Sequence, residues 1–301
     1  SRVSPLELGP PVGWPVQYRV VGPDKEEVRK IAKEVAQVLA ADADTRDAWM
    51  LRQLSQLGDD PSGLFAFVRA LRTESYPGSL RGTRGTLWSQ AGNSLDKASL
   101  LIALLRASGI PARYRHGSLS PSTTETLLGA LFSALPDTTG LVPADADVFD
   151  PLHDDVLLAE TGDHWWLDAY LPGQGWTAMD PAFASATAGA TFHASLAGDG
   201  SDLVAEVPDT QRHKVTFRLT VERFGPFSFT SLGMGTIQPL SATIPTVQLV
   251  GNPVSLEHWV DTVNQGGLVF ATTINTYLPY LVIGDEAIDG HAFARPHEQP
   301  I

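Results

Sequence analysis

Hydrophobic positions follow a helical period through the first third of the chain. Asp24 and Glu27 form a capping box, and apolar residues recur every three to four positions from there to Leu39. A second helix is predicted around residues 49–54, and a third begins at Asp60, a cap residue followed by a proline suited to the first turn. The N-terminal third is therefore expected to be mostly helical.

Residues 92–117 give the clearest pattern in the chain. Asn93 or Ser94 can cap a helix, and Gly109 can adopt the left-handed conformation that ends one. The positions between them are apolar nearly all round, which predicts a buried central helix. A short strand is expected over residues 112–116, after a proline that directs the chain out of the helix.

The period changes to that of strands in the second half. Residues 164–171 and 176–180 flank a Pro-Gly-Gln-Gly turn and predict a β-hairpin, whereas residues 143–158 are acidic and irregular. Apolar and polar residues alternate strictly over 215–222. Further strand-like runs lie at residues 246–250, 267–273 and 280–283. We therefore expect an extended lead-in over 1–23, a first domain over 24–185, a linker over 186–209 and a small β domain over 210–301.

Charge and composition exclude several classes of function. The chain of 301 residues has 34 acidic and 21 basic side chains, a net charge of −13 that argues against nucleic acid as a partner. No stretch approaches the roughly 18 consecutive apolar residues of a membrane span, so none is expected. There is no cysteine, which excludes disulfides, thiolate metal sites and thiol nucleophiles. The first residues lack an initiator Met and an apolar signal core, so we expect a piece of a longer polypeptide.

Three polar residues could form a catalytic constellation. Ser94 lies at the predicted N-terminus of the central helix, where free amides can stabilise an oxyanion. His164 begins one strand of the hairpin and could act as a general base, while Asp180 on the returning strand could fix its tautomer. The same residues have simpler readings, because Ser is a preferred helix cap and Asp-Pro a common turn starter.

Three sequence blocks carry a resemblance to a known family. They are Gly92-Asn93-Ser94-x-Asp96-x-Ala98 continuing to Tyr114, His164-x-Trp166-x-Asp168-Ala169-Tyr170, and Trp176-x-x-x-Asp180-Pro181. These blocks resemble the transglutaminase-like superfamily, over about residues 60–185. The resemblance implies an α+β, papain-like fold, with a central helix packed on an antiparallel sheet, which the small β domain predicted above follows. It also implies a Cys-His-Asp site that forms a thioester with an amide and passes the acyl group to an amine or water.

Two shorter segments extend the resemblance. Tyr76-x-Gly78-Ser79-Leu80-Arg81-Gly82 and Thr276-Tyr277-Leu278-Pro279 are similar to parts of large bacterial secreted or surface proteins. They imply a secreted or cell-surface location within a larger bacterial protein, and a protein or peptide as substrate or ligand.

The sequence departs from the family at the nucleophile, because Ser94 occupies the position of the Cys. Three explanations stay open: a domain that has lost its nucleophile and serves as a binding or structural module, a Ser-His-Asp amidase or protease, and an active Cys enzyme trapped by substitution to Ser. A hydroxyl needs much stronger base assistance than a thiol, so we favour an inactive or weakened domain.

Other candidate residues surround these three. Gln90 or Trp88 could donate a hydrogen bond to an oxyanion, and Trp165, Trp166 and Trp176 could line a peptide groove. Ser94 and Lys97 formally match the S-x-x-K motif of penicillin-recognising enzymes, but their companion motifs are absent from the sequence.

No cofactor and no metal are expected. The acidic positions Asp145, Asp147, Asp150, Asp154 and Asp155 lack the spacing of an EF-hand, so they are interpreted as a solvated loop.

Overall fold

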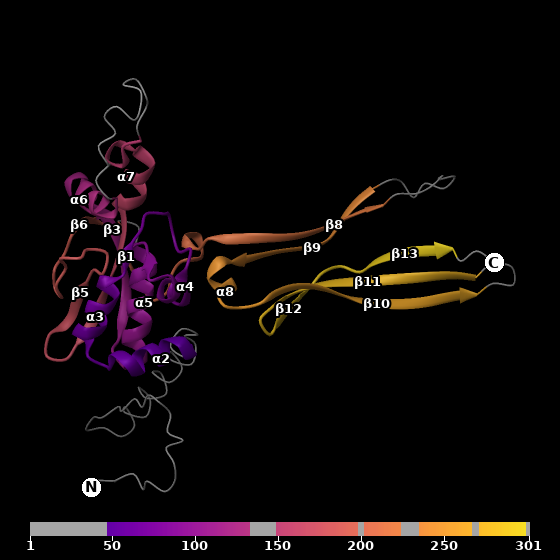
Figure 1. The fold of residues 1–301 in the computed structure, drawn as a ribbon, viewed down its shortest axis with the longest axis horizontal. Helices are drawn as coiled ribbons and strands as arrows, with labels where there is room; N and C mark the ends of the chain where they lie inside the picture. The colour runs from indigo at the N-terminus through magenta and orange to yellow at the C-terminus, as the bar shows by residue number, and fades with distance from the viewer. Residues whose placement is uncertain (1–46, 133–148, 198–201, 224–234, 267–270, 299–301) are drawn as a thin grey trace, which may run out of the picture. The chain divides into compact units, whose positions relative to one another are not determined.

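The computed structural model describes residues 47–132, 149–197, 202–223, 235–266 and 271–298 (Figure 1). The chain divides into two compact units, Ser1–Gln211 and Arg212–Ile301, and each is described by itself. The expected lead-in over 1–23 and the helix expected after Asp24 lie outside the described residues.

Helices make up much of the first unit. They are α2 (Ala48–Leu57), α3 (Pro61–Ala70), α4 (Gly82–Ser89), α5 (Ser94–Ala107), α6 (Pro121–Leu131) and α7 (Asp155–Gly162), with a short 3₁₀ helix at Pro151–His153. The predicted second and third helices are confirmed as α2 and α3, and Asp60 caps α3 by accepting a hydrogen bond from the Gly63 amide at 2.9 Å. The sequence did not predict α4 and α6, whose Gly, Ser and Thr residues are weak helix formers, or α7, which begins inside the segment read as irregular.

The central helix α5 lies in the middle of the first unit (Figure 1), as its apolar pattern predicts. Its N-cap is Asn93, whose Oδ1 accepts a hydrogen bond from the Asp96 amide at 2.8 Å. Gly109, just beyond the helix, has a φ of 86°, a left-handed conformation that glycine adopts without a Cβ clash. The fully buried core side chains along the helix include Leu100, Leu101, Leu104 and Leu105.

A five-stranded antiparallel sheet packs against α5. Its order is β5 (Gly175–Met179), β4 (Asp163–Leu171), β3 (Ala112–Leu119) and β6 (His193–Leu196), and β7 (Leu203–Val204) also pairs with β3. The predicted hairpin is confirmed, with Leu167 opposite Met179. Together with α5 the sheet gives the expected α+β architecture.

The segment expected to be a linker, residues 186–209, contributes two strands to this sheet. β6 pairs with residues Gly117 to Leu119, and β7 pairs with Tyr114 and Arg115. A Cβ on Gly117 would lie 2.1 Å from the Ser195 carbonyl oxygen, so β6 approaches β3 this closely only because a glycine stands there. Small, polar composition misled the interpretation of this segment, since short edge strands need little apolar sequence.

The second unit is built from long strands. They are β8 (Lys214–Arg223), β9 (Gly235–Pro245), β10 (Val254–Gly266), β11 (Ala271–Ile283), β12 (Glu286–Asp289) and β13 (Phe293–Glu298). β8 and β9 form one antiparallel pair, while β10, β12 and β13 all pair with β11. A small core forms where Leu240, Ala242 and Ile244 of β9 meet Leu281 and Ile283 of β11.

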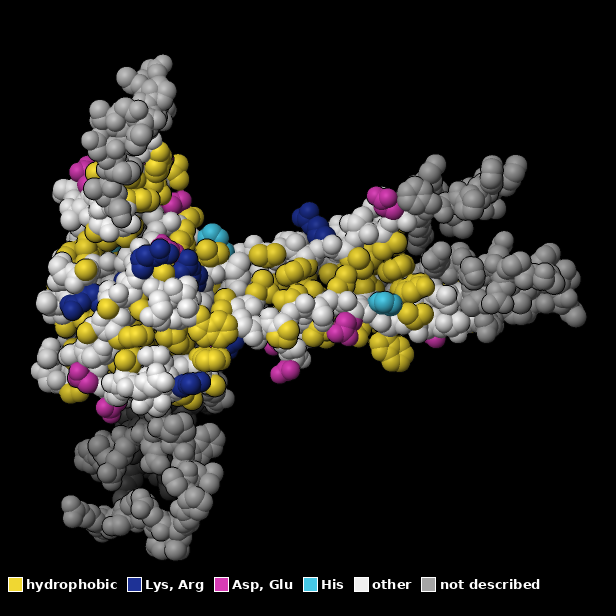
Figure 2. All heavy atoms as spheres, in the orientation of Figure 1, with side chains coloured by type: hydrophobic (Ala, Val, Ile, Leu, Met, Phe, Trp, Pro, Cys, Tyr) yellow, Lys and Arg dark blue, Asp and Glu magenta, His cyan; other side chains and the backbone are white. Residues whose placement is uncertain are grey.

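The strand predictions for the second unit were confirmed in part. The alternation over 215–222 corresponds to β8, and residues 280–283 lie within β11, but residues 246–249 form one helical turn, α8 (Thr246–Leu249), in place of a strand. Of the strand expected over 267–273, residues 267–270 lie outside the described part. Apolar side chains remain on the surface of β10, where Trp259 is 70% exposed, and Figure 2 shows apolar atoms along this unit's strands. In the described ranges we find no helix with the length and hydrophobicity to cross a membrane.

One buried carboxylate joins α5 to the loop that precedes α4. Asp96 is completely buried and accepts hydrogen bonds from Tyr76 Oη at 2.8 Å and from Ser79 Oγ at 2.6 Å. It also accepts from the backbone amides of Leu80, Arg81 and Gly82 at 3.2, 2.8 and 3.0 Å. A charge is tolerated in a protein interior when it is fully hydrogen-bonded in this way.

Replacing Asp96 with Ala is expected to lower the free energy of unfolding by about 3 kcal/mol or more, because five donors lose their acceptor inside the protein. The matched control is Asp60→Ala, which removes an exposed helix cap and should cost about 1 kcal/mol. Urea unfolding followed by tryptophan fluorescence measures both, since Trp49, Trp88, Trp165, Trp166 and Trp176 all lie in the first unit. Equal losses in the two variants would contradict the role assigned to Asp96.

Candidate functional site

Ser94 is the first residue of α5, as predicted, and its side chain is half-buried. Its Oγ accepts a hydrogen bond from the backbone amide of Trp165 at 3.3 Å. This contact brings the helix N-terminus against the start of β4, the strand that carries His164. The Ser94 hydroxyl therefore lies at the N-terminus of α5, beside the strand that carries His164.

His164 and Asp180 form a buried pair. His164 Nε2 lies 2.8 Å from Asp180 Oδ2, and the two side chains are 1% and 3% exposed. An ionised carboxylate only accepts hydrogen bonds, so this pairing holds the imidazole proton on Nε2 and leaves a lone pair on Nδ1. Within the described residues, His164 Nδ1 is buried without a hydrogen-bond partner.

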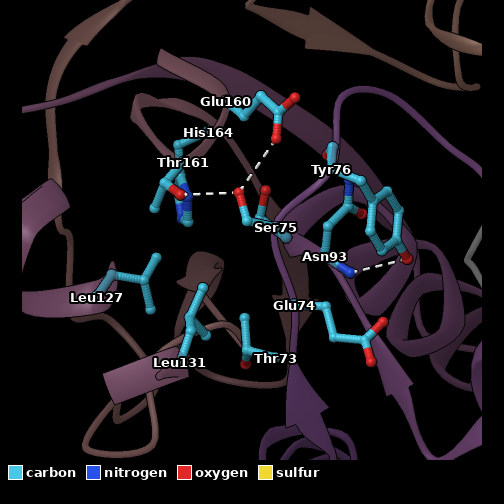
Figure 3. Close-up of a pocket in the computed structure, with 11 residues that line it drawn as sticks. Thr73, Glu74, Ser75, Tyr76, Asn93, Leu127, Leu131, Glu160, Thr161 and His164 are labelled. Atoms are coloured by element: carbon cyan, nitrogen blue, oxygen red, sulfur yellow. Dashed lines mark hydrogen bonds between the residues drawn. The ribbon is translucent and has the colours of Figure 1, made fainter. Parts of the chain in front are cut away.

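Ser94 and His164 line the same pocket. Figure 3 labels His164 among the other lining residues. Ser75 lies between Thr161 and Glu160, and its Oγ is 3.0 Å from Thr161 Oγ1. The remaining lining residues are Thr73, Glu74, Tyr76, Asn93, Leu127 and Leu131. The pocket combines hydroxyl and carboxylate groups with two leucines from α6, and about 260 Å³ of it is empty, including the part open to solvent.

The wall of this pocket on the α5 side is fixed by Tyr76 and Asn93. The side-chain Nδ2 of Asn93 donates to the carbonyls of Tyr76 at 2.8 Å and Gly78 at 2.7 Å. The backbone N–H of Asn93 donates to Tyr76 Oη at 3.0 Å. Burial and the negative charge of Asp96 raise the pKa of Tyr76 above its usual value, so the phenol keeps its proton and donates it to Asp96. Sequence reasoning missed this function of Tyr76; its place in the Tyr76-x-Gly78 segment of the resemblance was the available signal.

Lys97 lies one helical turn after Ser94 and is completely buried. Its Nζ donates to Leu71 O at 2.8 Å, Thr73 Oγ1 at 2.9 Å and Arg69 O at 3.3 Å. Burial lowers the pKa of Lys97 to about 8, and the nearby charge of Asp180 acts in the opposite direction. The Lys97 amine is bound to these three acceptors and, within the described ranges, makes no hydrogen bond to Ser94. The formal S-x-x-K match therefore does not bring Lys97 and Ser94 together.

The two oxyanion candidates are engaged elsewhere. Gln90 ends α4 in a left-handed conformation, and its Nε2 donates to Leu87 O at 2.6 Å. Trp88 is 46% exposed and packs edge-on against Trp49, with ring centroids 5.2 Å apart. Neither is among the described residues that line the pocket of Ser94, so their oxyanion role stays a prediction. Proximity to Ser94 in the sequence could not predict that the end of α4 turns the side chains of Trp88 and Gln90 outward.

The three tryptophans predicted to line a groove do not all lie on one face of the sheet. Trp165 and Trp166 are each 3% exposed; Trp165 stacks on His116 at 4.2 Å and Trp166 stacks on His193 at 4.5 Å. Trp176 is 45% exposed, and the Arg113 guanidinium carbon lies 3.9 Å from its ring centroid. Trp165 points to the opposite face of β4 from Trp166, because neighbouring residues of a strand alternate. Trp166 shares its face with Tyr170, which pairs with Trp176, so Trp166 and Trp176 lie on one face but differ in burial.

The acidic segment offers no metal centre among the residues described. Asp150 accepts from the Leu152 amide at 3.0 Å and Asp154 from the Leu157 amide at 2.9 Å, so both serve as caps. Asp145 and Asp147 lie outside the described residues. In the described ranges, no group of three or more His, Asp or Glu side chains is arranged to hold a metal ion.

Comparison with known families adds to this geometry. Residues 64–181 match the family model of the transglutaminase-like superfamily. This part of the chain belongs to the transglutaminase-like superfamily. The match contains α5, Ser94 and the His164–Asp180 pair, and it ends one residue after Asp180. Comparison with curated proteins and with solved structures found no match.

Lys97 gives the transglutaminase-like domain a testable pH dependence. A lysine whose folded pKa of about 8 lies below its unfolded value binds fewer protons when folded, so its unfavourable contribution is relieved as the pH rises from about 8 towards 10. Between these pH values the free energy of unfolding of the native protein is expected to rise relative to that of Lys97→Met. Urea unfolding of both proteins across this range measures the difference. Parallel pH curves would contradict the burial effect.

Proposed function

We propose that this transglutaminase-like domain, with Ser-His-Asp in place of Cys-His-Asp, is inactive or much weakened in acyl transfer on protein amide groups and acts as a binding module of a larger bacterial protein. The observation that supports this most directly is that, among the described residues, no hydrogen bond joins Ser94 to His164. Its Oγ accepts the Trp165 amide hydrogen, while His164 Nδ1, on the same pocket, is unpartnered. The base and the hydroxyl share a site without the hydrogen bond that would activate the nucleophile.

The chemistry of the hydroxyl supports the same proposal. A thiol with a pKa near 8.5 is readily converted to a thiolate beside an imidazole, whereas a hydroxyl must lose its proton during attack. A helix N-terminus assists an anion, but it cannot offset the whole difference, since its contribution is at most about 2 kcal/mol.

The pocket is better suited to one side chain or a short peptide segment than to a large ligand. Its empty volume of about 260 Å³ includes space open to solvent, so the enclosed part is smaller. Leu127 and Leu131 can contact methylene groups, and Ser75 and Thr161 can bind an amide. A side chain of a protein or peptide ligand can make these contacts, and no cofactor is part of the proposal.

The first test compares the native protein with Ser94→Ala and His164→Ala. Incorporation of a fluorescent primary amine into a glutamine-rich protein, together with release of ammonia, should be equal and at background in all three. A native rate that exceeds Ser94→Ala and falls in His164→Ala would refute the proposed inactivity.

The second test restores the thiol. Ser94→Cys is expected to gain activity over Ser94→Ala, because the His164–Asp180 pair is already formed at 2.8 Å. The control is Ser94→Cys combined with His164→Ala, which should return the rate to background. Absence of any gain would mean that the rest of the site is also incompetent, and would leave binding as the role of the pocket.

An active Ser-His-Asp amidase is the alternative, and the intact His164–Asp180 pair is the observation that favours it. A fluorophosphonate probe should leave Ser94 unlabelled in the native protein while labelling a control serine hydrolase under the same conditions. Labelling that disappears in Ser94→Ala would establish the amidase in place of the binding module.

A further inference from the structure

We propose that Lys97 is a positioning residue for the His164–Asp180 pair, acting by joining the turn that carries Asp180 to α3 and to the helix of Ser94. The inference rests on the site described under the proposed function. It assigns a structural cause to the orientation of that site's acid and base, whatever reaction or ligand the site serves.

The ammonium group lies at the C-terminal end of α3. Arg69 is in the last turn of that helix and Leu71 is its C-cap, and the carbonyls of both accept hydrogen bonds from Lys97 Nζ. A cation is favoured there because the last carbonyls of a helix are unpaired and carry a partial negative charge. With Thr73 Oγ1 as third acceptor, all three N–H donors of the ammonium group have partners.

Thr73 passes this connection on to the turn after β5. Its Oγ1 accepts from Lys97 and donates to Ala182 O at 3.0 Å. The amide of Ala182 in turn donates to Asp180 Oδ1 at 3.1 Å, and the other carboxylate oxygen binds His164. Lys97 is thus two hydrogen bonds from the backbone of Ala182, whose N–H holds the carboxylate in place.

Helix capping alone does not account for a lysine at this position. Burying an ammonium group with three neutral acceptors is costly, and among the described residues Lys97 makes no ion pair within 4.0 Å. The nearby negative charge that offsets this cost is Asp180. The positive charge therefore acts on the carboxylate directly as well as through Thr73.

The test is to replace Lys97 with Met, which keeps the length of the side chain, and to observe His164 in the full chain by ¹⁵N-histidine NMR. The His164 signals are identified by their absence in His164→Gln. In Lys97→Met, the His164 Nε2 proton should exchange with water about tenfold faster or more. The reason is that the Asp180 carboxylate, which accepts this proton's hydrogen bond, is no longer held in place. The Nε2–H tautomer should also give way to a mixture.

Two further variants separate positioning from general loosening. Thr73→Val removes the hydroxyl link while Lys97 remains, and should give a smaller change of the same kind at His164. Leu101→Ala leaves a cavity elsewhere along α5, where Leu101 is fully buried, and should leave the His164 tautomer unchanged. Thr73→Val also provides the answer if Lys97→Met does not fold.

The proposal is overturned if, in Lys97→Met, His164 keeps its native exchange rate and tautomer while the amides at the end of α3 exchange faster. If only Thr73→Val folds, the same result in that variant overturns it. That result would restrict Lys97 to capping α3. The measurement needs no turnover, so a failure here is distinct from a failure of the proposed function, which is judged by activity alone.

Discussion

The N-terminus of α5 depends on the buried carboxylate of Asp96. Five donors from residues 76–82 converge on its carboxylate. Asn93, the N-cap of α5, binds the same loop by donating to two of its backbone carbonyls. Because both residues belong to the first turn or cap of the helix, the loop and the helix end are held as one piece. Ser94 lies between them, so its position is set by contacts that its own side chain does not make.

Local sequence patterns predicted those elements whose stability comes mainly from their own apolar faces, caps and turns. α5, α3 and the β4–β5 hairpin were found at their expected places because Asn93, Asp60 and the Pro-Gly-Gln-Gly turn mark their ends. β6 and β7 escaped prediction, since they are held by pairing with β3 and by the close approach at Gly117, and neither cause is visible in local sequence. The turn of α8 likewise overrode a β-branched run.

The candidate site divides in a similar way. Ser94, His164 and Asp180 stood out as candidates because each occupies a recognisable block, and the structure brings all three into one region. The oxyanion and groove residues could not be identified from neighbouring positions, because where a side chain points depends on the left-handed end of α4 and on the two faces of β4. The pocket wall from Ser75 and Thr161 joins segments distant in sequence, so no local motif contains it.

An intact His–Asp pair is often read as a sign of catalysis, but here the pair also has a folding role. Asp180 is 2% exposed, accepts from the Ala182 amide, and lies near the buried charge of Lys97. Removing either partner would leave buried polar groups unpaired, which costs about 1–3 kcal/mol for each. The pair therefore stabilises the domain whether or not it moves a proton.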